Sequence, residues 1–237
     1  MYYILILTHK LNLSKVKEKH WLKNIKIPYL IVYGDDSIDD DYIYNKNEKL
    51  LIVKTPDTYE YLTLKLACAY KAVLNIPEID ITGLFKVDDD VVVNLNELYN
   101  YIEMPVQEDY SGHVYRIKDK APCSHHQSKV RDKLLKNITF AFELSHICYG
   151  PMYYLSKRAL QTIVGKFSYH NFSIYSTDMF EDYTFANILK RSNIHPVCMK
   201  MYTDDLDQFT RYNFISFHDA DHSRNLLQID QTVNKIN

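Results

Sequence analysis

The chain has 237 residues, of which 46% are hydrophobic and 24% are charged, as is typical of a globular protein with a sizeable core. Its formal net charge of −2 leaves no basic excess for neutralising phosphates, which argues against non-specific nucleic-acid binding. No apolar run approaches the about 18 residues that span a bilayer, and residues 1–7 are too short for a signal peptide. We therefore expect a protein without a membrane span, located in the cytoplasm.

The cysteine spacing excludes two common kinds of small scaffold. The four cysteines lie far apart in the chain, at Cys68, Cys123, Cys148 and Cys198. Without a CxxC pair they predict neither a disulfide framework nor a zinc knuckle, so free thiols in a reducing compartment are expected. Because the sequence has no internal repeat or Gly/Ser linker, residues 1–237 are predicted to form a single domain.

The first half of the chain alternates apolar strand segments with helical ones. Strands are predicted over 2–8, 28–33, 50–54 and 85–87. Helices are predicted from the N-cap Ser14 to about residue 24, from 56 to 75, and over 96–102. Residues 35–41 are predicted to form an acidic loop. The lysine-rich segments 15–26 and 129–136 are interpreted as solvated helix faces.

The second half continues the alternation. Strands are predicted over 110–115, 147–155, 196–202 and 214–218, and helices over 157–164, after the N-cap Ser156, and 181–191. Residues 116–140 are polar and poorly patterned, so a mobile or substrate-facing loop is expected, and residues 225–237 are expected to fray. Strands that alternate with helices predict an α/β sandwich with a mainly parallel central sheet.

Three successive carboxylates, Asp88, Asp89 and Asp90, follow the predicted strand over 85–87 and precede a second apolar run. A cation would relieve their mutual repulsion, and Mn²⁺ or Mg²⁺ prefers such oxygen ligands. Asp88 and Asp90 project to one side of an extended segment, because side chains alternate along it. Open α/β sheets bind ligands at the carboxyl ends of their strands, so a metal held here would suit the phosphates of a nucleotide. The plain alternative is a solvated acidic turn.

Four sequence motifs resemble those of a known protein family and occur in the same order as in that family. Residues 57–65 (DTYEYLTLK) are similar to D-S-Y-x-N-L-T-L-K, and residues 85–94 (FKVDDDVVVN) to K-T-D-D-D-V-F-V-N. Residues 149–156 (YGPMYYLS) are similar to C-S-G-G-G-Y-V-L-S, and Glu181-Asp182-Tyr183 stands at the position of E-D-V. Trp21 matches the Trp of an N-terminal block. The chain thereby resembles the β-1,3-galactosyltransferase, β-1,3-N-acetylglucosaminyltransferase and Fringe family.

The resemblance implies a glycosyltransferase A-type fold, which is a Rossmann-like three-layer sandwich. It also implies an inverting, metal-dependent transfer from a UDP-sugar to a hydroxyl of a glycan or glycoprotein acceptor. Cellular members carry a membrane anchor and luminal disulfides that this sequence lacks, so we expect a compact enzyme of a large DNA virus or a microbe, with a homodimer as a possible assembly. The glycine-rich pocket segment is reduced to Gly150-Pro151-Met152, which leaves the donor sugar open.

The resemblance also implies a metal site for Mn²⁺ or Mg²⁺. In it Asp90 is the direct ligand, Asp88 belongs to the same acidic cluster and suits the sugar or ribose hydroxyls, and His218 is the third protein ligand. A surface histidine is the plain alternative for His218. His222, four residues later, leaves a zinc pair open as another interpretation.

Asp182 occupies the family's general-base position, and its apolar neighbours are expected to raise its pKa towards neutrality. The plain alternative is an acidic pair favoured by a helix amino terminus, which would explain Glu181 equally well. The expected nucleotide-sugar contacts lie at strand ends and in the family motifs: Thr8, Lys10, Asp57, Lys65, Asp88, Asp89, Gly150 and Glu181. Lys65 also fits a solvated helix lysine.

Two other functions use an Asp-x-Asp turn or this kind of fold. A two-metal nucleotidyltransferase or phosphohydrolase would need a second acidic cluster nearby. An inactive carbohydrate-binding module would not need the candidate metal ligands, general base and histidine, all of which are present in this sequence. Residues 123–126 (CSHH) suggest a further metal cluster, but a lone cysteine beside two histidines in a polar segment is more often part of a loop.

Overall fold

The computed structural model describes residues 1–105, 108–117, 121–122, 129–218 and 226–234. Its centre is an eight-stranded sheet with the strand order β11-β7-β10-β5-β1-β2-β4-β3. The strands of this sheet are β1 (Tyr2–Leu7), β2 (Tyr29–Gly34), β3 (Tyr42–Asn45), β4 (Leu50–Val53), β5 (Gly83–Asp88), β7 (Tyr110–Ile117), β10 (Ser145–Ser156) and β11 (Val197–Cys198). The four central strands β5, β1, β2 and β4 are parallel, whereas β10 runs antiparallel to β5.

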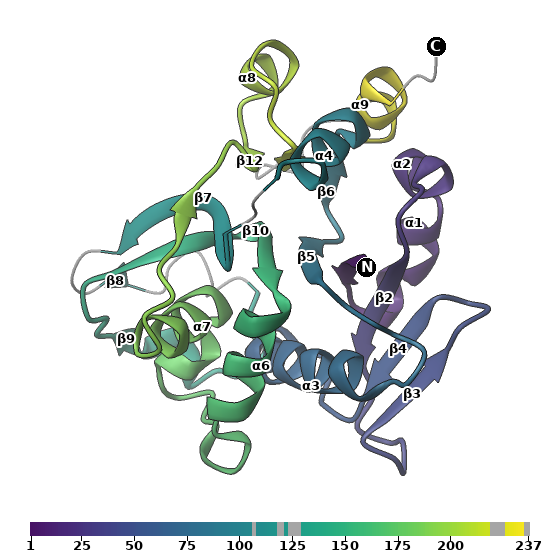
Figure 1. Ribbon diagram of the computed structural model, residues 1–237. Coiled ribbons are helices and arrows are strands. Elements are labelled where there is room, and N and C mark those ends of the chain that lie inside the picture. The colour runs from purple at the N-terminus through teal and green to yellow at the C-terminus, as the bar shows by residue number, and fades with distance from the viewer. Residues whose placement is uncertain (106–107, 118–120, 123–128, 219–225, 235–237) are drawn as a thin grey trace.

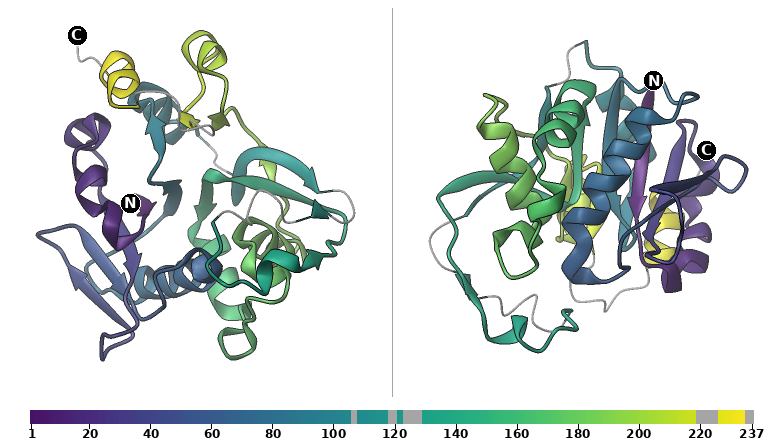
Figure 2. Two further views of the ribbon diagram at one scale, coloured as in Figure 1. Left: turned by 180° about the vertical axis from the view of Figure 1, so that it is seen from behind. Right: turned by 90° about the horizontal axis from the view of Figure 1, so that it is seen from below.

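Helices cover both faces of the sheet, which confirms the predicted three-layer α/β architecture (Figures 1 and 2). The helices are α1 (Leu13–Lys17), α2 (His20–Asn24), α3 (Leu62–Asn75), α4 (Leu95–Ile102), α6 (Lys157–Lys166), α7 (Glu181–Lys190), α8 (Leu206–Arg211) and α9 (Leu226–Val233). Strand β1 explains the layering, because its side chains alternate between two cores. Leu5 and Leu7 pack with α3, α6 and α7, whereas Ile4 and Ile6 pack with α1, α2 and α4.

A second, three-stranded sheet joins the acidic turn to the C-terminal part of the chain. It has the order β12-β13-β6 and consists of β12 (Tyr202–Thr203), β13 (Ser216–His218) and β6 (Val91–Val93). Since β6 begins directly after Asp90 and His218 pairs with Val91, this register carries His218 to the acidic turn. Two short strands, β8 (Ala121–Pro122) and β9 (Thr139–Phe140), form a separate pair.

Two predicted elements differ from the structure, and one edge strand was not predicted. The helix predicted over 14–24 is interrupted between α1 and α2, because Lys19 adopts an extended backbone with φ −56° and ψ 130°. The strand predicted over 196–202 is divided between β11 and β12, which belong to different sheets. The edge strand β3 was missed, because its side chains alternate between half-buried and exposed rather than forming an apolar run.

The C-terminal segment is also more ordered than its sequence suggests. Helix α9 covers Leu226–Val233, where a frayed tail was expected. Its Asp230 is 2% exposed and accepts hydrogen bonds from the backbone N–H groups of His20 and Trp21 at 2.7 and 3.0 Å. Asp230 therefore caps the amino end of α2 from a distant part of the chain, a contact that no local pattern reveals.

The polar segment 116–140 is largely irregular, as predicted, but its described C-terminal part is anchored to the core. Val130, Leu135 and Phe140 are buried, and the Glu60 carboxylate accepts hydrogen bonds from the backbone N–H groups of Arg131 and Asp132. None of the helices in the described part of the chain has the length and apolarity to cross a bilayer. Three of the four cysteines, Cys68, Cys148 and Cys198, are free thiols, as expected.

Candidate active site

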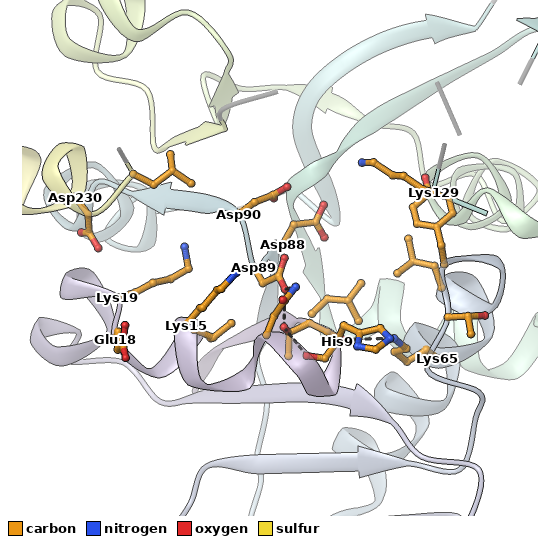
Figure 3. Close-up of a pocket in the computed structure, with 18 of the residues that line it drawn as sticks. His9, Lys15, Glu18, Lys19, Lys65, Asp88, Asp89, Asp90, Lys129 and Asp230 are labelled. Atoms are coloured by element: carbon orange, nitrogen blue, oxygen red, sulfur yellow. Dashed lines mark hydrogen bonds between the residues drawn. The ribbon is translucent and has the colours of Figure 1, made fainter. Parts of the chain in front are cut away.

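A cavity of about 860 Å³ opens at the carboxyl ends of β1 and β5, where Thr8 and the acidic turn line it (Figure 3). Its volume lies in the range that small-molecule and cofactor sites occupy. The parallel register of β1 and β5 pairs Leu7 with Asp88, so the next residues of the two strands, Thr8 and Asp89, meet at the same edge. The cavity therefore lies where strands β1 and β5 end together, which is the edge at which the sequence predicts the site.

The three carboxylates of the turn do not form one cluster but reach three different partners. Asp88 Oδ1 lies 2.7 Å from the Lys86 ammonium. Asp89 Oδ2 accepts hydrogen bonds from Thr8 Oγ1 at 2.5 Å and from Asn12 Nδ2 at 3.1 Å. Asp90 Oδ2 lies 3.1 Å from His218 Nε2. Asp89 is thus tied to the framework of the site, and Asp90 is joined to the predicted histidine.

Asp90 and His218 have the donor set that a divalent cation requires. Burial alone would raise the pKa of Asp90, but the hydrogen bond from His218 and the charges of His218 and Lys129 together lower it. Likewise, burial alone would lower the pKa of His218, but Asp90 raises it. The second oxygen of Asp90, Oδ1, is buried and has no hydrogen-bond partner among the described residues. An orphaned carboxylate oxygen beside an imidazole nitrogen suits Mn²⁺ or Mg²⁺.

Across the described ranges, no group of three or more His, Cys, Asp or Glu side chains is arranged to hold a metal ion. Mg²⁺-type ions usually bind through one or two carboxylates together with substrate phosphates, so a cation at Asp90 and His218 would need a bound ligand to complete its coordination. Asp88, predicted as a further metal residue, instead points to Lys86. The residues therefore fit a cation that shares its coordination with a ligand.

Lys86 is a further residue of the site, to which the sequence alone assigned no role. It is fully buried on β5, and its ammonium lies 2.7 Å from Asp88 Oδ1 and 3.1 Å from Glu181 Oε1 and donates to the Gly150 carbonyl. Burial alone would lower the pKa of Lys86, but the two carboxylates raise it. The lysine therefore joins the acidic turn to the start of α7 and to β10.

Glu181 lies 4% exposed at the start of α7, between Lys86 and a buried tyrosine pair. Its Oε2 accepts a hydrogen bond from the Tyr153 hydroxyl at 2.9 Å, and that hydroxyl lies 2.9 Å from the Tyr70 hydroxyl. Burial raises the pKa of Glu181 to about 7, and it raises the pKa of Asp88 to about 6. One ammonium between the buried carboxylate of Glu181 and the half-buried carboxylate of Asp88 leaves an excess negative charge, which favours their protonated forms.

Asp182, the predicted general base, lies partly exposed next to Glu181. Its Oδ1 accepts a hydrogen bond from the Tyr183 N–H at 2.8 Å, and burial raises its pKa, which is the expected direction. A Cβ atom placed on Gly150 would lie 3.3 Å from Glu181 Oε1 and 3.8 Å from Asp182 Oδ2. Gly150 thus lies directly beside both carboxylates, and the described structure brings these three predicted residues together.

The predicted nucleotide residues form a hydrogen-bonded group beneath the cavity. Lys65 is 3% exposed, and its ammonium lies 2.5 Å from Asp57 Oδ1 and 3.4 Å from the Thr8 carbonyl. The interpretation of Lys65 as a solvated lysine is therefore wrong, since it lines the cavity. Lys10 lies outside the cavity lining: its backbone N–H donates to Asp57, and its exposed ammonium is 2.9 Å from Asp35. Asp57, Gly150 and Glu181 also lie outside the lining.

The lysine-rich segments are not merely solvated helix faces. Lys15, Lys19 and Lys129 line the cavity, and Figure 3 shows Lys129 on the opposite side of the acidic turn from the other two. Lys19 is 9% exposed, donates to the Val91 carbonyl at 3.0 Å, and has a pKa lowered by burial. The break between α1 and α2, which no sequence signal marked, turns Lys19 inward. These cations suit an anionic ligand.

Two predicted alternatives lie outside the described residues. They are the zinc pair with His222 and the cluster of Cys123, His125 and His126.

Comparison with known proteins assigns the chain to a family. The model of the family described as galactosyltransferase matches residues 15–200. The chain belongs to the galactosyltransferase family. It is therefore a glycosyltransferase, and its three-layer architecture agrees with the expected glycosyltransferase A-type fold. No curated protein sequence matches the chain significantly.

Several solved structures are similar to the galactosyltransferase-family chain at low sequence identity. One is a glycosyltransferase involved in the glycosylation of the major capsid of PBCV-1, with 9% identity, 99% of both chains covered and a TM-score of 0.44. Another is the galactosyltransferase LgtC, with 8% identity, 99% and 97% covered, and a TM-score of 0.45. A third is the inositol-1-phosphate CTP transferase from T. maritima, with 10% identity, 84% and 85% covered, and a TM-score of 0.43.

Proposed function

We propose that this glycosyltransferase moves a sugar from a UDP-sugar to a hydroxyl of a glycan or glycoprotein acceptor, with inversion at the anomeric carbon and with Mn²⁺ or Mg²⁺ bound. The observation that carries the proposal is Asp90, whose buried Oδ1 has no hydrogen-bond partner in the described part of the chain and which lies beside His218 at the edge of a nucleotide-sized cavity. Family membership supports glycosyl transfer as the chemistry.

In this proposal Asp90 and His218 hold the cation, which supplies positive charge to the leaving diphosphate when it is bound. Thr8 and Lys65 lie on the nucleotide side, and Lys15, Lys19 and Lys129 add positive charge around the cavity. Asp88 and Asp89 are held in place by Lys86 and Thr8, and so shape the wall against which the donor lies. Positioning of this kind supplies a large part of the rate enhancement in group transfer.

Asp182 acts as the general base. It removes the proton from the acceptor hydroxyl while the acceptor oxygen forms its bond to the anomeric carbon and the bond from that carbon to UDP breaks. The raised pKa of Asp182 suits this task, because a base whose pKa approaches the working pH accepts a proton more readily. Glu181, held by Lys86 and Tyr153, positions the amino end of α7 rather than reacting itself.

Thermal unfolding with a panel of UDP-sugars, each with and without Mn²⁺, tests the proposal. A ligand at one hundred times its dissociation constant stabilises by about 2.7 kcal/mol. We expect one UDP-sugar to stabilise the protein only with Mn²⁺ present, and Asp90→Asn to lose that response. Asp80→Asn, at an exposed carboxylate, is the matched control. Equal stabilisation without Mn²⁺, or a normal response from Asp90→Asn, would contradict the metal site, and stronger stabilisation by nucleoside triphosphates would favour a nucleotidyltransferase.

A further inference from the structure

A row of three tyrosines, Tyr115, Tyr149 and Tyr202, leads from the surface to the acidic turn. The ring centroids of Tyr115 and Tyr149 lie 6.3 Å apart, and those of Tyr149 and Tyr202 lie 5.3 Å apart. Beyond them, the Tyr202 hydroxyl lies 3.4 Å from His218 Nδ1. The row thus ends at the histidine that is proposed to hold the cation.

The row is assembled from three separate strands. Tyr115 belongs to β7, Tyr149 to β10 and Tyr202 to β12, and Figure 1 shows β12 close to the ends of the other two. Tyr115 pairs across the sheet with Ile147, and the register of β7 and β10 shifts after Cys148, so Tyr149 meets Tyr115 where the pairing is irregular. Sequence reasoning had no signal for this row, because the three residues are far apart in the chain.

The outer two rings are unusually exposed for aromatic side chains in a folded domain. Tyr115 is 53% exposed and Tyr149 is 38% exposed, whereas Tyr202, at 4%, is buried and anchors the row. Exposed aromatic rings that stand together in a row present π faces, against which the C–H groups of a sugar ring pack. At the position of Tyr149, the family motif quoted above has serine, so this ring is a feature of this chain.

The row also lies beside the proposed base. Tyr149 directly precedes Gly150, where an added Cβ would lie 3.8 Å from Asp182 Oδ2. Burial raises the pKa of the Tyr149 phenol, and the nearby carboxylates of Asp182 and Asp204 raise it further. The charges facing Tyr149 are therefore negative, which disfavours a sugar acid and favours an uncharged ring.

We propose that Tyr149 and Tyr115 form the acceptor subsite, where they stack on a neutral hexopyranose ring and present its hydroxyl to Asp182. This inference rests on the proposed function, since it takes Asp182 as the base. It goes further by assigning a chemical class to the acceptor and a surface to its recognition.

Ligand-observed NMR on the full chain with UDP and Mn²⁺ tests the subsite directly. The probes are methyl β-galactoside, methyl β-glucoside, methyl N-acetyl-β-glucosaminide and, as the charged comparison, methyl β-glucuronide. We expect a neutral hexoside to bind the wild type more tightly than the glucuronide. Tyr149→Ala should weaken that binding about five- to tenfold, the range expected for a lost ring contact. Tyr149→Phe keeps the ring and should bind like the wild type.

Two variants keep the test decisive if Tyr149→Ala folds poorly. Tyr115→Ala should also weaken binding of the same hexoside. Tyr212→Ala, at a residue after α8 that is 54% exposed, is the control and should leave hexoside binding unchanged. Unchanged hexoside binding in both Tyr149→Ala and Tyr115→Ala would overturn the inference. So would a loss of UDP-sugar affinity instead of hexoside affinity, or no hexoside binding by a wild type that binds UDP with Mn²⁺. A wild type that does not bind UDP at all would overturn the proposed function first.

Discussion

The Lys86 ammonium lies 3.1 Å from the Glu181 carboxylate, so the strand that carries the acidic turn and the helix that carries Asp182 share one buried charge. Both residues are nearly inaccessible to solvent, and the lysine also contacts Asp88. This contact fixes the proposed donor side and the proposed base relative to one another. A displacement of either element would leave an uncompensated charge in the core, which is strongly unfavourable.

Replacing Lys86 with methionine should destabilise the protein by about 3–5 kcal/mol, because the buried carboxylate of Glu181 and the half-buried carboxylate of Asp88 would lose the ammonium that they share. Urea unfolding of the wild type and the variant measures the difference in their free energy of unfolding. Lys157→Met is the matched control: its ion pair with Asp80 is exposed, so its loss should cost less than about 1 kcal/mol. Similar losses in the two variants would contradict the role given to Lys86.

Glu181 should make the free energy of unfolding depend on pH. Its pKa is about 7 when folded and near the ordinary 4.5 when unfolded, so between these values the folded state retains a proton that the unfolded state has released. Stability from this group should therefore fall as pH rises from about 4.5 to about 7, with a slope of at most about 1.4 kcal/mol per pH unit.

Chemical denaturation across this window, for the wild type and Glu181→Gln, measures the effect as the difference between the two curves. Glu48→Gln is the control, because the exposed Glu48 has a pKa lowered by its hydrogen bond with Lys17. Its contribution is lost as pH falls, the opposite direction. A difference between wild type and Glu181→Gln that stays constant with pH would show that Glu181 titrates normally.

The central strands and the edge of the sheet at which the candidate site lies follow from features that a sequence displays. Apolar runs predicted the central strands, and the rule that parallel strands present their carboxyl ends at one edge placed Thr8 near the acidic turn. Lys86 could not be placed in the same way. Its burial depends on which face of β5 meets α7, and a lysine before three aspartates reads equally well as a surface charge. The Asp230 cap likewise joins segments about 210 residues apart.

Gly83 is required by the close approach of β10. A Cβ atom there would lie 2.2 Å from the hydroxyl oxygen of Tyr154, whose ring is buried among Phe85 and Tyr101. Gly83→Ala should therefore destabilise by about 1–3 kcal/mol through overpacking. Gly165→Ala in α6 meets nothing within 4 Å and should stabilise by about 0.5–1 kcal/mol. Thermal unfolding of both variants checks the opposite signs, and a shift of the same sign would contradict the packing argument.

Asp230 should contribute more to the free energy of unfolding than an ordinary helix cap does. Asp230→Ala removes the acceptor for two backbone N–H groups of α2 and for the Asn234 amide, all in buried surroundings. We expect a loss of about 2 kcal/mol or more, against about 1 kcal/mol for Asp205→Ala, whose side chain caps the exposed end of α8. Urea unfolding of the two variants decides the comparison, and an equal cost would mean that α9 contributes no more than a local cap.

The most direct test of glycosyl transfer at this site is product formation by Asp182→Asn under single-turnover conditions. The donor is the UDP-sugar that stabilises the wild type with Mn²⁺, and the acceptor is the hexoside that binds. Asp178→Asn, just before the same helix, is the matched control. We predict that Asp182→Asn binds the donor normally and forms no product, whereas Asp178→Asn transfers like the wild type. Transfer by Asp182→Asn at the wild-type rate would contradict the account.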